Sequence, residues 1–262
     1  MAKLEYTFKN DTLFKMLFVK HPDLLKRLVS RLLGIPFENI EQFYITNPEI
    51  PPDNLTEKFC RLDINMLVDE QKVDLEIQVQ NNEKDYQDRS LYYWAREFSS
   101  ALGEGEHYKE LPRTVIISIV YFKLFDCEDF HLEFQALEVK RHTPLTDKQS
   151  LHYFELLKLP DVVSCDDELK LWLMLLKAKT EEELKQIETL GVPVMEKAIE
   201  AYRHITQTDE FKEIERLRSR ARHNEASALH HVAEVERDKW QKVIAEKDAI
   251  IAKLQAQLSD DK

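Results

Sequence analysis

The chain has 262 residues, 43% hydrophobic and 10% aromatic, which is enough apolar material for at least one sizeable packed core. Only four residues are glycine, and neither GxGxxG nor GxxxxGK(S/T) occurs, so no nucleotide cofactor is expected. The net charge of −12 is unlike that of a typical basic nucleic-acid-binding domain.

The termini and cysteines indicate where the protein resides. The N-terminus has no signal-peptide pattern, and no apolar run is long enough to cross a membrane. Cys60, Cys127 and Cys165 are odd in number, far apart and without CxxC spacing, so neither a zinc site nor a disulfide framework is indicated. The sequence therefore predicts a cytoplasmic protein with reduced thiols and no membrane partner.

The chain opens with a helical pattern. Residues 10–33 place apolar side chains at helical spacing, and His21-Pro22 breaks the pattern, so two shorter helices are allowed. Gly34 ends the second of them. Asp11 immediately precedes the apolar pattern and is therefore expected to cap the first helix. A short strand is expected at residues 42–46.

Residues 58–80 read as two alternating strands joined by a polar turn at 69–72. Apolar side chains share one face of this hairpin, and the other face carries Asp63, Asn65, Asp74, Glu76, Gln78 and Gln80. A turn centred on 69–72 pairs Asn65 with Glu76 and places Asp63 diagonal to Glu76. Since opposed and diagonal residues lie about 5 to 8 Å apart, the two carboxylates would suit one hard cation. The alternative is an ordinary hairpin with one solvated face.

Further elements follow in order. A helix is expected at 85–102, a nearly continuous apolar strand at 114–121 and an alternating strand at 131–139. From about residue 147 the strand signals stop, and the patterns become helical at 167–179, 180–190 and 193–206. Thr180 and Glu183 have the spacing of a capping box at the start of the second of these helices.

The C-terminal region reads as one long helix or a coiled coil. From Thr208 to Leu258 there is no proline or glycine, and apolar residues recur every three or four positions among charged ones. Such a stripe cannot be buried within a single helix. We therefore expect a homodimer through this helix, with packing back on the preceding helices as the alternative.

Four stretches together resemble a known family. Asp63, followed after twelve residues by Glu76-x-Gln78, is similar to the core motif of the PD-(D/E)xK nuclease superfamily, with Gln78 in the usual lysine position. The stretches NDTLFKMLF (10–18), DRSLYYWAR (88–96) and GEHYKELP (105–112) occur in the order found in the transposase-like Rpn family of recombination-promoting nucleases. The resemblance covers roughly residues 5–160.

The resemblance implies both a fold and an activity. It implies an α/β, restriction-endonuclease-like core at 1–146, with a mixed sheet flanked by helices, then a helical extension at 147–208 and the long charged helix or coiled coil at 209–262. The implied activity is that of a metal-dependent DNA endonuclease with little sequence specificity, linked to recombination or mobile elements. The partner would be DNA.

The same resemblance assigns roles to residues. Asp63, Glu76 and the backbone carbonyl of Ile77 would hold a divalent ion, Mg²⁺ in the first place and Mn²⁺ or Ca²⁺ as alternatives. Gln78 would orient the attacking water without the positive charge of lysine, and Asp11 has the alternative role of holding a metal-bound water. Apart from the resemblance, charge and position make Lys15, Lys58, Arg61, Gln80 and Arg89 candidate DNA contacts. The alternative is a solvated surface role, or for Arg89 an ion pair with Asp85 or Asp88. Because glutamine brings no charge, the competing hypothesis is an inactive nuclease fold that serves as a DNA-binding or oligomerising scaffold.

Overall fold

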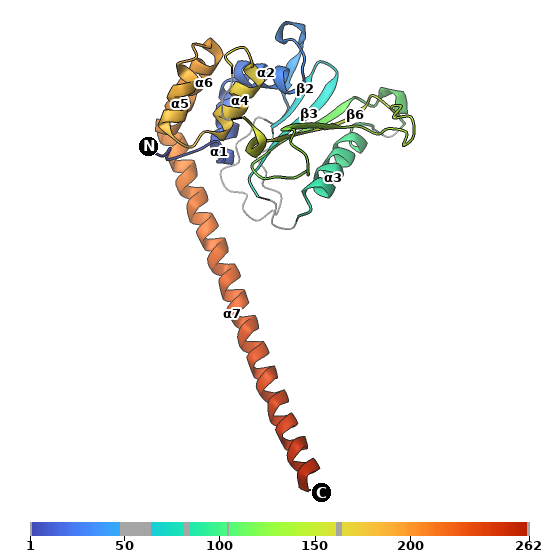
Figure 1. Ribbon diagram of the computed structural model, residues 1–262, viewed down its shortest axis with the longest axis vertical. Helices are drawn as coiled ribbons and strands as arrows, with labels where there is room; N and C mark the ends of the chain where they lie inside the picture. The colour runs from blue at the N-terminus through green and yellow to red at the C-terminus, as the bar shows by residue number, and fades with distance from the viewer. Residues whose placement is uncertain (1, 48–63, 81–83, 104, 161–163, 261–262) are drawn as a thin grey trace. The chain divides into compact units, whose positions relative to one another are not determined.

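The computed structural model describes residues 2–47, 64–80, 84–103, 105–160 and 164–260 (Figure 1). They fall into two compact units, the first ending at residue 212 and the second containing the rest of the C-terminal helix. Within the described ranges, no helix is both long enough and apolar enough to cross a membrane.

The opening helical pattern forms two helices, α1 (Asp11–Lys20) and α2 (Pro22–Leu32), as predicted. Asp11 is the first residue of α1 and not its cap, so the capping prediction was wrong. The cap is Asn10, whose Oδ1 accepts a 2.9 Å hydrogen bond from the Leu13 amide. The capping side chain lies one residue earlier than expected because the helix already begins at Asp11.

Six strands form one mixed sheet in the order β1-β2-β3-β4-β6-β5. Their bounds are β1 (Phe43–Ile45), β2 (Ile64–Val68), β3 (Gln71–Gln78), β4 (Thr114–Val120), β5 (His131–Phe134) and β6 (Gln149–Glu155). The three strands β3, β4 and β6 run parallel, and the remaining pairs are antiparallel. All seven residues of β4 are buried, as expected of a central strand.

Strand β6 corrects the prediction that strand signals stop at residue 147. It lies between β4 and β5, so the sheet crosses the boundary predicted at 146/147. Ser150, His152 and Glu155 interrupt its apolar pattern, and each is buried with hydrogen-bond partners inside the protein. The neighbouring β5 is also shorter than expected, since it ends at Phe134 and not at Val139.

The hairpin register also differs from the prediction. The turn between β2 and β3 has two residues, Asp69 and Glu70, and Asn65 pairs with Asp74 instead of Glu76. Asp69 has a φ of +53°, the left-handed backbone that two-residue hairpin turns require. Moving the centre of the turn by one residue shifts every pair by two, which preserves the faces of the strands but changes which residues oppose each other.

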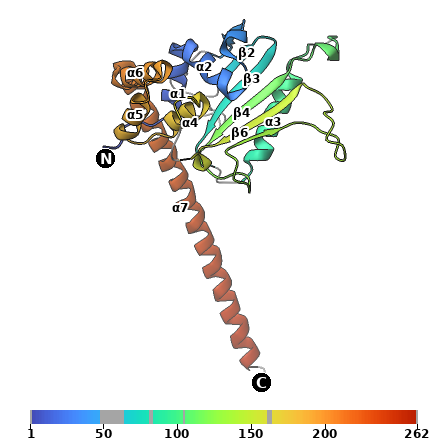
Figure 2. The ribbon, with the colours of Figure 1, turned by 45° about the horizontal axis from the view of Figure 1, so that its top comes forward.

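Helices cover both faces of the sheet (Figure 2). Helix α3 (Tyr86–Ser99) packs on the face that carries Ile116, Val120, Leu151 and Tyr153. Helices α1, α2 and α4 (Glu168–Lys177) lie on the other.

Ion pairs join two of the helices on that second face. The carboxylate of Glu168 accepts hydrogen bonds from Arg27 at 2.6 and 2.8 Å and from Arg31 at 2.7 Å. These bonds tie α2 to α4. Burial alone would raise the pKa of Glu168, but its two guanidinium partners outweigh this effect and lower it.

The remaining helices of the first unit follow the prediction. They are α5 (Glu181–Glu188) and α6 (Pro193–Gln207), and the capping box of Thr180 and Glu183 is confirmed. The connections that the structure describes also contain short 3₁₀ helices, namely η1 (Phe37–Asn39), η2 (Tyr108–Glu110) and η3 (Leu156–Lys158).

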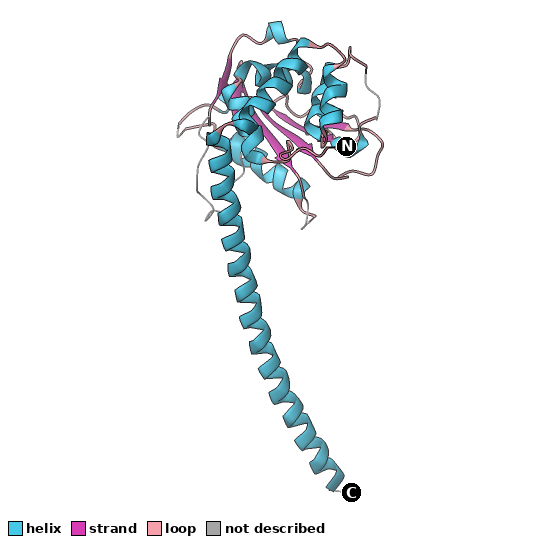
Figure 3. Ribbon diagram, turned by 90° about the vertical axis from the view of Figure 1, so that its left-hand side faces the viewer, coloured by secondary structure: helices cyan, strands magenta, loops and turns pink. Residues whose placement is uncertain are grey.

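The C-terminal residues form a single helix, α7 (Asp209–Asp260), drawn without interruption in Figure 3. Its first turn belongs to the first compact unit, because buried Phe211 packs edge-on against Tyr6 at 4.9 Å between ring centroids. Further along, several large apolar side chains among those described are exposed: Val235, Trp240, Ile244, Ile250 and Ile251. The long helix is thus confirmed, and the coiled coil stays a prediction.

Candidate active site

Glu76 is a buried carboxylate under helix α3. It lies on β3 in register with Ser118 of β4, and its side chain is only 1% exposed. The Tyr86 hydroxyl, from the first turn of α3, donates a 2.9 Å hydrogen bond to Oε2 of Glu76. The polar face of the hairpin is therefore not a plain solvated face at this position, because α3 covers it.

A second tyrosine approaches the same carboxylate from β6. Tyr153 is in register with Ser118, and its hydroxyl lies 2.5 Å from the Ser90 hydroxyl of α3. Burial raises the pKa of Tyr153, the hydrogen bond to Ser90 opposes this, and the negative charge of Glu76 raises it further. The Tyr153 hydroxyl therefore keeps its proton at neutral pH and can donate a hydrogen bond.

Arg89 lies one helical turn beyond the start of α3. Its guanidinium carbon is 5.0 Å from the centroid of the Tyr86 ring, a cation–π contact. Its Nε and Nη2 atoms are buried, and they form no hydrogen bond with any residue in the described ranges. Among these residues, the predicted alternative of an ion pair with Asp85 or Asp88 does not form either. Such a guanidinium, held over the ring of the tyrosine that bonds to Glu76, is suited to bind an oxyanion such as a phosphodiester.

Gln78 and Gln80 lie at the end of β3. The Gln78 amide nitrogen donates a 2.6 Å hydrogen bond to the Gln80 carbonyl, and Gln80 is exposed. Ile77, between Glu76 and Gln78, is half-buried. In this conformation the Gln78 amide is engaged by its own strand.

The other predicted site residues lie on α1 or outside the described ranges. Lys15 is on α1 and is only 4% exposed, so it is not a surface contact in this structure, and Asp11 is exposed on the same helix. Three residues, Asp63, Lys58 and Arg61, lie outside the described residues. The structure thus brings Glu76 and Arg89 together through Tyr86, and it leaves Lys15 and Asp11 on a helix of the other sheet face.

The donor atoms at Glu76 fit a hard divalent ion in type. Carboxylate oxygens are the ligands that Mg²⁺ and Ca²⁺ prefer, and Asp74 lies two residues earlier on the same face of β3. Within the described residues, no cluster of three or more His, Cys, Asp and Glu has the arrangement to hold a metal ion. A complete site therefore needs a further ligand, which is the role predicted for Asp63.

The mixed sheet, the helices on both of its faces and the buried glutamate of β3 together define a nuclease-like α/β protein. Residues 8–232 match the family described as PD-(D/E)XK nuclease family transposase, and the chain belongs to that family. The match links the chain to nuclease-like chemistry and to mobile elements. Neither the search of curated proteins nor the search of solved structures finds a match.

Sequence reasoning missed three residues around the glutamate, namely Tyr86, Ser90 and Tyr153. Tyr153 could not be found because the strand that carries it was not predicted. Tyr86 and Ser90 are four residues apart, which is the spacing of one helix face, and this was the available signal.

Proposed function

We propose that this chain is a divalent-metal-dependent DNA endonuclease that hydrolyses phosphodiester bonds with little sequence preference, acting in recombination or on mobile elements. The observation that supports the proposal best is the buried Glu76 carboxylate, oriented by Tyr86 in a chain that matches a nuclease family. Asp63, Glu76 and the Ile77 carbonyl would hold the metal ion, with Mg²⁺ as the first candidate and Mn²⁺ or Ca²⁺ as alternatives.

The bound ion would supply an activated water and stabilise charge on the phosphate. Residues of the chain would orient the metal ligand, the substrate and the attacking water. Tyr86 holds the Glu76 carboxylate through its hydrogen bond, and Arg89 would bind the phosphodiester. Gln78 would orient the water, for which its amide must leave the Gln80 carbonyl. Because it carries no charge, we expect slower cleavage than with lysine at this position.

The proposal is tested by incubating supercoiled plasmid with the full-length protein and Mg²⁺, Mn²⁺ or Ca²⁺, each against EDTA. Metal-dependent nicked or linear product is expected. The Asp63→Ala protein, purified in parallel, must lose this product, because otherwise a contaminating nuclease or another site is responsible. Cleavage that persists in EDTA would contradict the metal requirement.

The second candidate is a catalytically inactive nuclease fold that binds DNA or assembles as a scaffold. The observation that favours it is the Gln78 amide, which takes the position usual for lysine and bonds to its own strand. DNA binding in a gel-shift assay without cleavage under any of the three metals would support this candidate over the first.

A further inference from the structure

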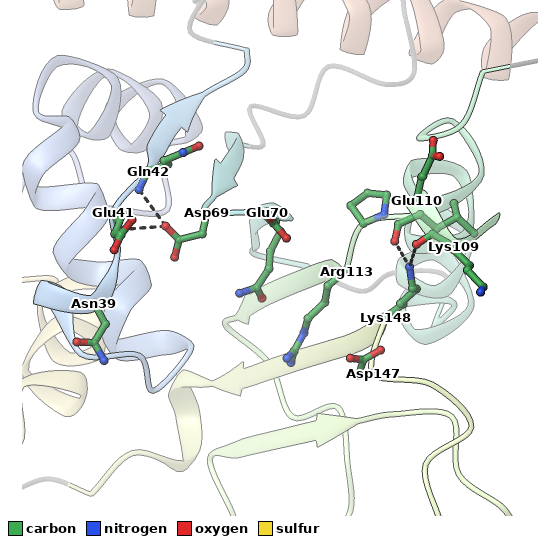
Figure 4. Close-up of a pocket in the computed structure, with 13 residues that line it drawn as sticks. Asn39, Glu41, Gln42, Asp69, Glu70, Lys109, Glu110, Arg113, Asp147 and Lys148 are labelled. Atoms are coloured by element: carbon green, nitrogen blue, oxygen red, sulfur yellow. Dashed lines mark hydrogen bonds between the residues drawn. The ribbon is translucent and has the colours of Figure 1, made fainter. Parts of the chain in front are cut away.

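A polar pocket of about 860 Å³ lies at the opposite end of β3 from Gln78 (Figure 4). It is formed where β2 turns into β3 and where β4 and β6 begin. Gln71 lines the pocket and Glu76 lies five residues further along the strand, which corresponds to about 16 Å. The pocket is therefore separate from the proposed nuclease site, and a ligand bound here does not depend on nuclease activity.

Hydrogen bonds brace the walls of this pocket. On one side the Asp69 carboxylate accepts from the backbone amides of Glu41 and Gln42, both at 2.9 Å. On the other side the Lys148 ammonium donates to the carbonyl of Lys109 at 2.9 Å and to that of Leu111. Figure 4 shows these two sets of bonds on either side of Arg113. Both walls of the pocket are thus fixed by bonds within the chain.

Arg113 lies between these walls. Its Nε atom is buried without a hydrogen bond in the described part of the chain. Its positive charge helps to lower the pKa of the Glu133 carboxyl, which lies outside the pocket lining. Its backbone carbonyl accepts a 2.9 Å bond from the Lys72 amide, which fixes the residue in the sheet. A half-buried guanidinium of this kind on a fixed backbone is a binding site for a carboxylate or phosphate oxygen.

The charges around the pocket select among anions. The acids that line it are Glu41, Asp69, Glu70, Glu110 and Asp147, and the bases are Lys109, Arg113 and Lys148, so five acids face three bases and the net charge is −2. All of these acids except Asp69 are exposed. A polyanion such as a nucleic-acid strand would be repelled by this ring, whereas a cationic group would be attracted to it.

We propose that this pocket binds a small zwitterion, with its carboxylate on Arg113 and its cationic group among the exposed acids Glu41, Glu70 and Asp147. The ligand class is that of free amino acids or short peptides. A ligand of this kind satisfies the guanidinium and the acidic surroundings together. Neither a simple anion nor a simple cation does both.

The test is calorimetric titration of the full-length protein with L-lysine. Acetate, cadaverine and inorganic phosphate serve as the anion-only, cation-only and phosphate arms. We expect one L-lysine per chain, with acetate and cadaverine each about tenfold weaker or more. Arg113→Gln should weaken L-lysine binding by a similar factor, and Glu70→Gln, on the exposed turn, by several-fold. Arg141→Gln, an exposed arginine outside the pocket, is the matched control and should change nothing.

His152 gives a second readout that does not depend on a variant. Burial is the main cause of the lowered pKa of His152; Glu133 opposes it, and the charges of His131 and Arg113 add to it. A carboxylate bound at Arg113 should therefore raise the pKa of His152 in an NMR titration with saturating L-lysine.

Three results would overturn the proposal: no binding of L-lysine, binding that Arg113→Gln leaves unchanged, or phosphate bound more tightly than L-lysine through Arg113. If Arg113→Gln fails to fold, Glu70→Gln and the His152 titration decide between binding at this pocket and binding elsewhere.

Discussion

The Tyr86 hydroxyl donates a 2.9 Å hydrogen bond to the Glu76 carboxylate. Both side chains are buried, Tyr86 on the first turn of α3 and Glu76 on strand β3. We expect Tyr86→Phe to destabilise the fold by about 2 kcal/mol, because a buried hydrogen bond to a charged group is lost. The variant should also require more metal for half-maximal cleavage, since the carboxylate is no longer held in one orientation. Urea unfolding and a metal titration of plasmid cleavage measure the two effects. Tyr92→Phe, exposed on the same helix, is the control, and equal losses in both variants would contradict the assignment.

Glu76 itself is best tested by its amide. Glu76→Gln keeps the shape of the side chain and an oxygen that can accept from Tyr86, but it removes the charge that would hold the metal ion. We expect cleavage to fall by about two orders of magnitude or more while the unfolding midpoint changes little. Glu128→Gln, the same change at an exposed glutamate outside the site, is the matched control and should retain the activity of the parent. Full metal-dependent cleavage by Glu76→Gln would show that the proposed site is wrong.

Gln78→Lys restores the residue usual in the superfamily. Lysine also carries a donor that can reach the Gln80 carbonyl, and the position is only half-buried, so we expect a stability change within about 1 kcal/mol. The ammonium should raise the cleavage rate through its charge on the phosphate or the attacking water. Thermal unfolding and single-turnover cleavage test both expectations. A large loss of stability would mean that Gln78 belongs to a buried neutral network.

The exposed apolar side chains of α7 predict a homodimer. The double variant Trp240→Glu with Ile244→Glu should be monomeric by light scattering at micromolar concentration, while the parent is dimeric, because two charges on the apolar stripe prevent helix pairing. Linear plasmid should decrease relative to nicked plasmid, since two active sites are no longer joined. Lys242→Glu, between them on a polar position, is the control. A monomeric parent would rule the dimer out. Unlike a truncation at residue 209, these substitutions retain Phe211, which packs against Tyr6 in the first compact unit.

The buried histidine of β6 predicts a pH dependence of stability. Burial lowers the pKa of His152 from 6.5 to about 4. Between these values the unfolded chain binds a proton that the folded chain does not, so stability is fully present above pH 6.5 and falls as the pH falls toward 4. From pH 7 to pH 5 we expect the free energy of unfolding to fall by about 2 kcal/mol. The pKa of His131 is also lowered, so this residue adds to the loss.

Urea unfolding at pH 7, 6 and 5 measures this loss. His152→Gln should lose most of this pH dependence and keep only the part due to His131. His107→Gln, in an exposed loop, should behave as the parent does. Ordinary carboxylates titrate below this range, so they do not obscure the comparison. A parent whose stability is constant from pH 7 to pH 5 would contradict the prediction.

The helices and the central strand were predictable because each is specified by local pattern. Examples are the break at His21-Pro22, the capping box at Thr180 and the unbroken apolar run of β4. Each of these signals spans only a few neighbouring residues. The family resemblance also identified the α/β fold and its nuclease class. These are the features that the structure and the family match confirm.

The features that sequence reasoning missed depend on contacts distant in sequence. A turn of two or four residues leaves the same side chains on the same face, so the pattern could not distinguish Asp74 from Glu76 as the partner of Asn65. The polar residues of β6 resemble a loop until their partners are known, since Ser150 bonds to Glu133 and Glu155 to the amides of Leu124 and Phe125. The contact between Tyr153 and Ser90 was missed for the same reason, because Tyr153 lies on β6.

The late position of β6 affects synthesis on the ribosome. β4 is complete at residue 120, but the strand that covers its second edge is not made until residues 149–155. During that interval a seven-residue apolar strand has an open edge in the nascent chain, a template for pairing with other chains. Messenger RNAs truncated between codons 120 and 149 should therefore yield fragments that aggregate. The nascent protein should depend on chaperones until β6 has emerged from the ribosome.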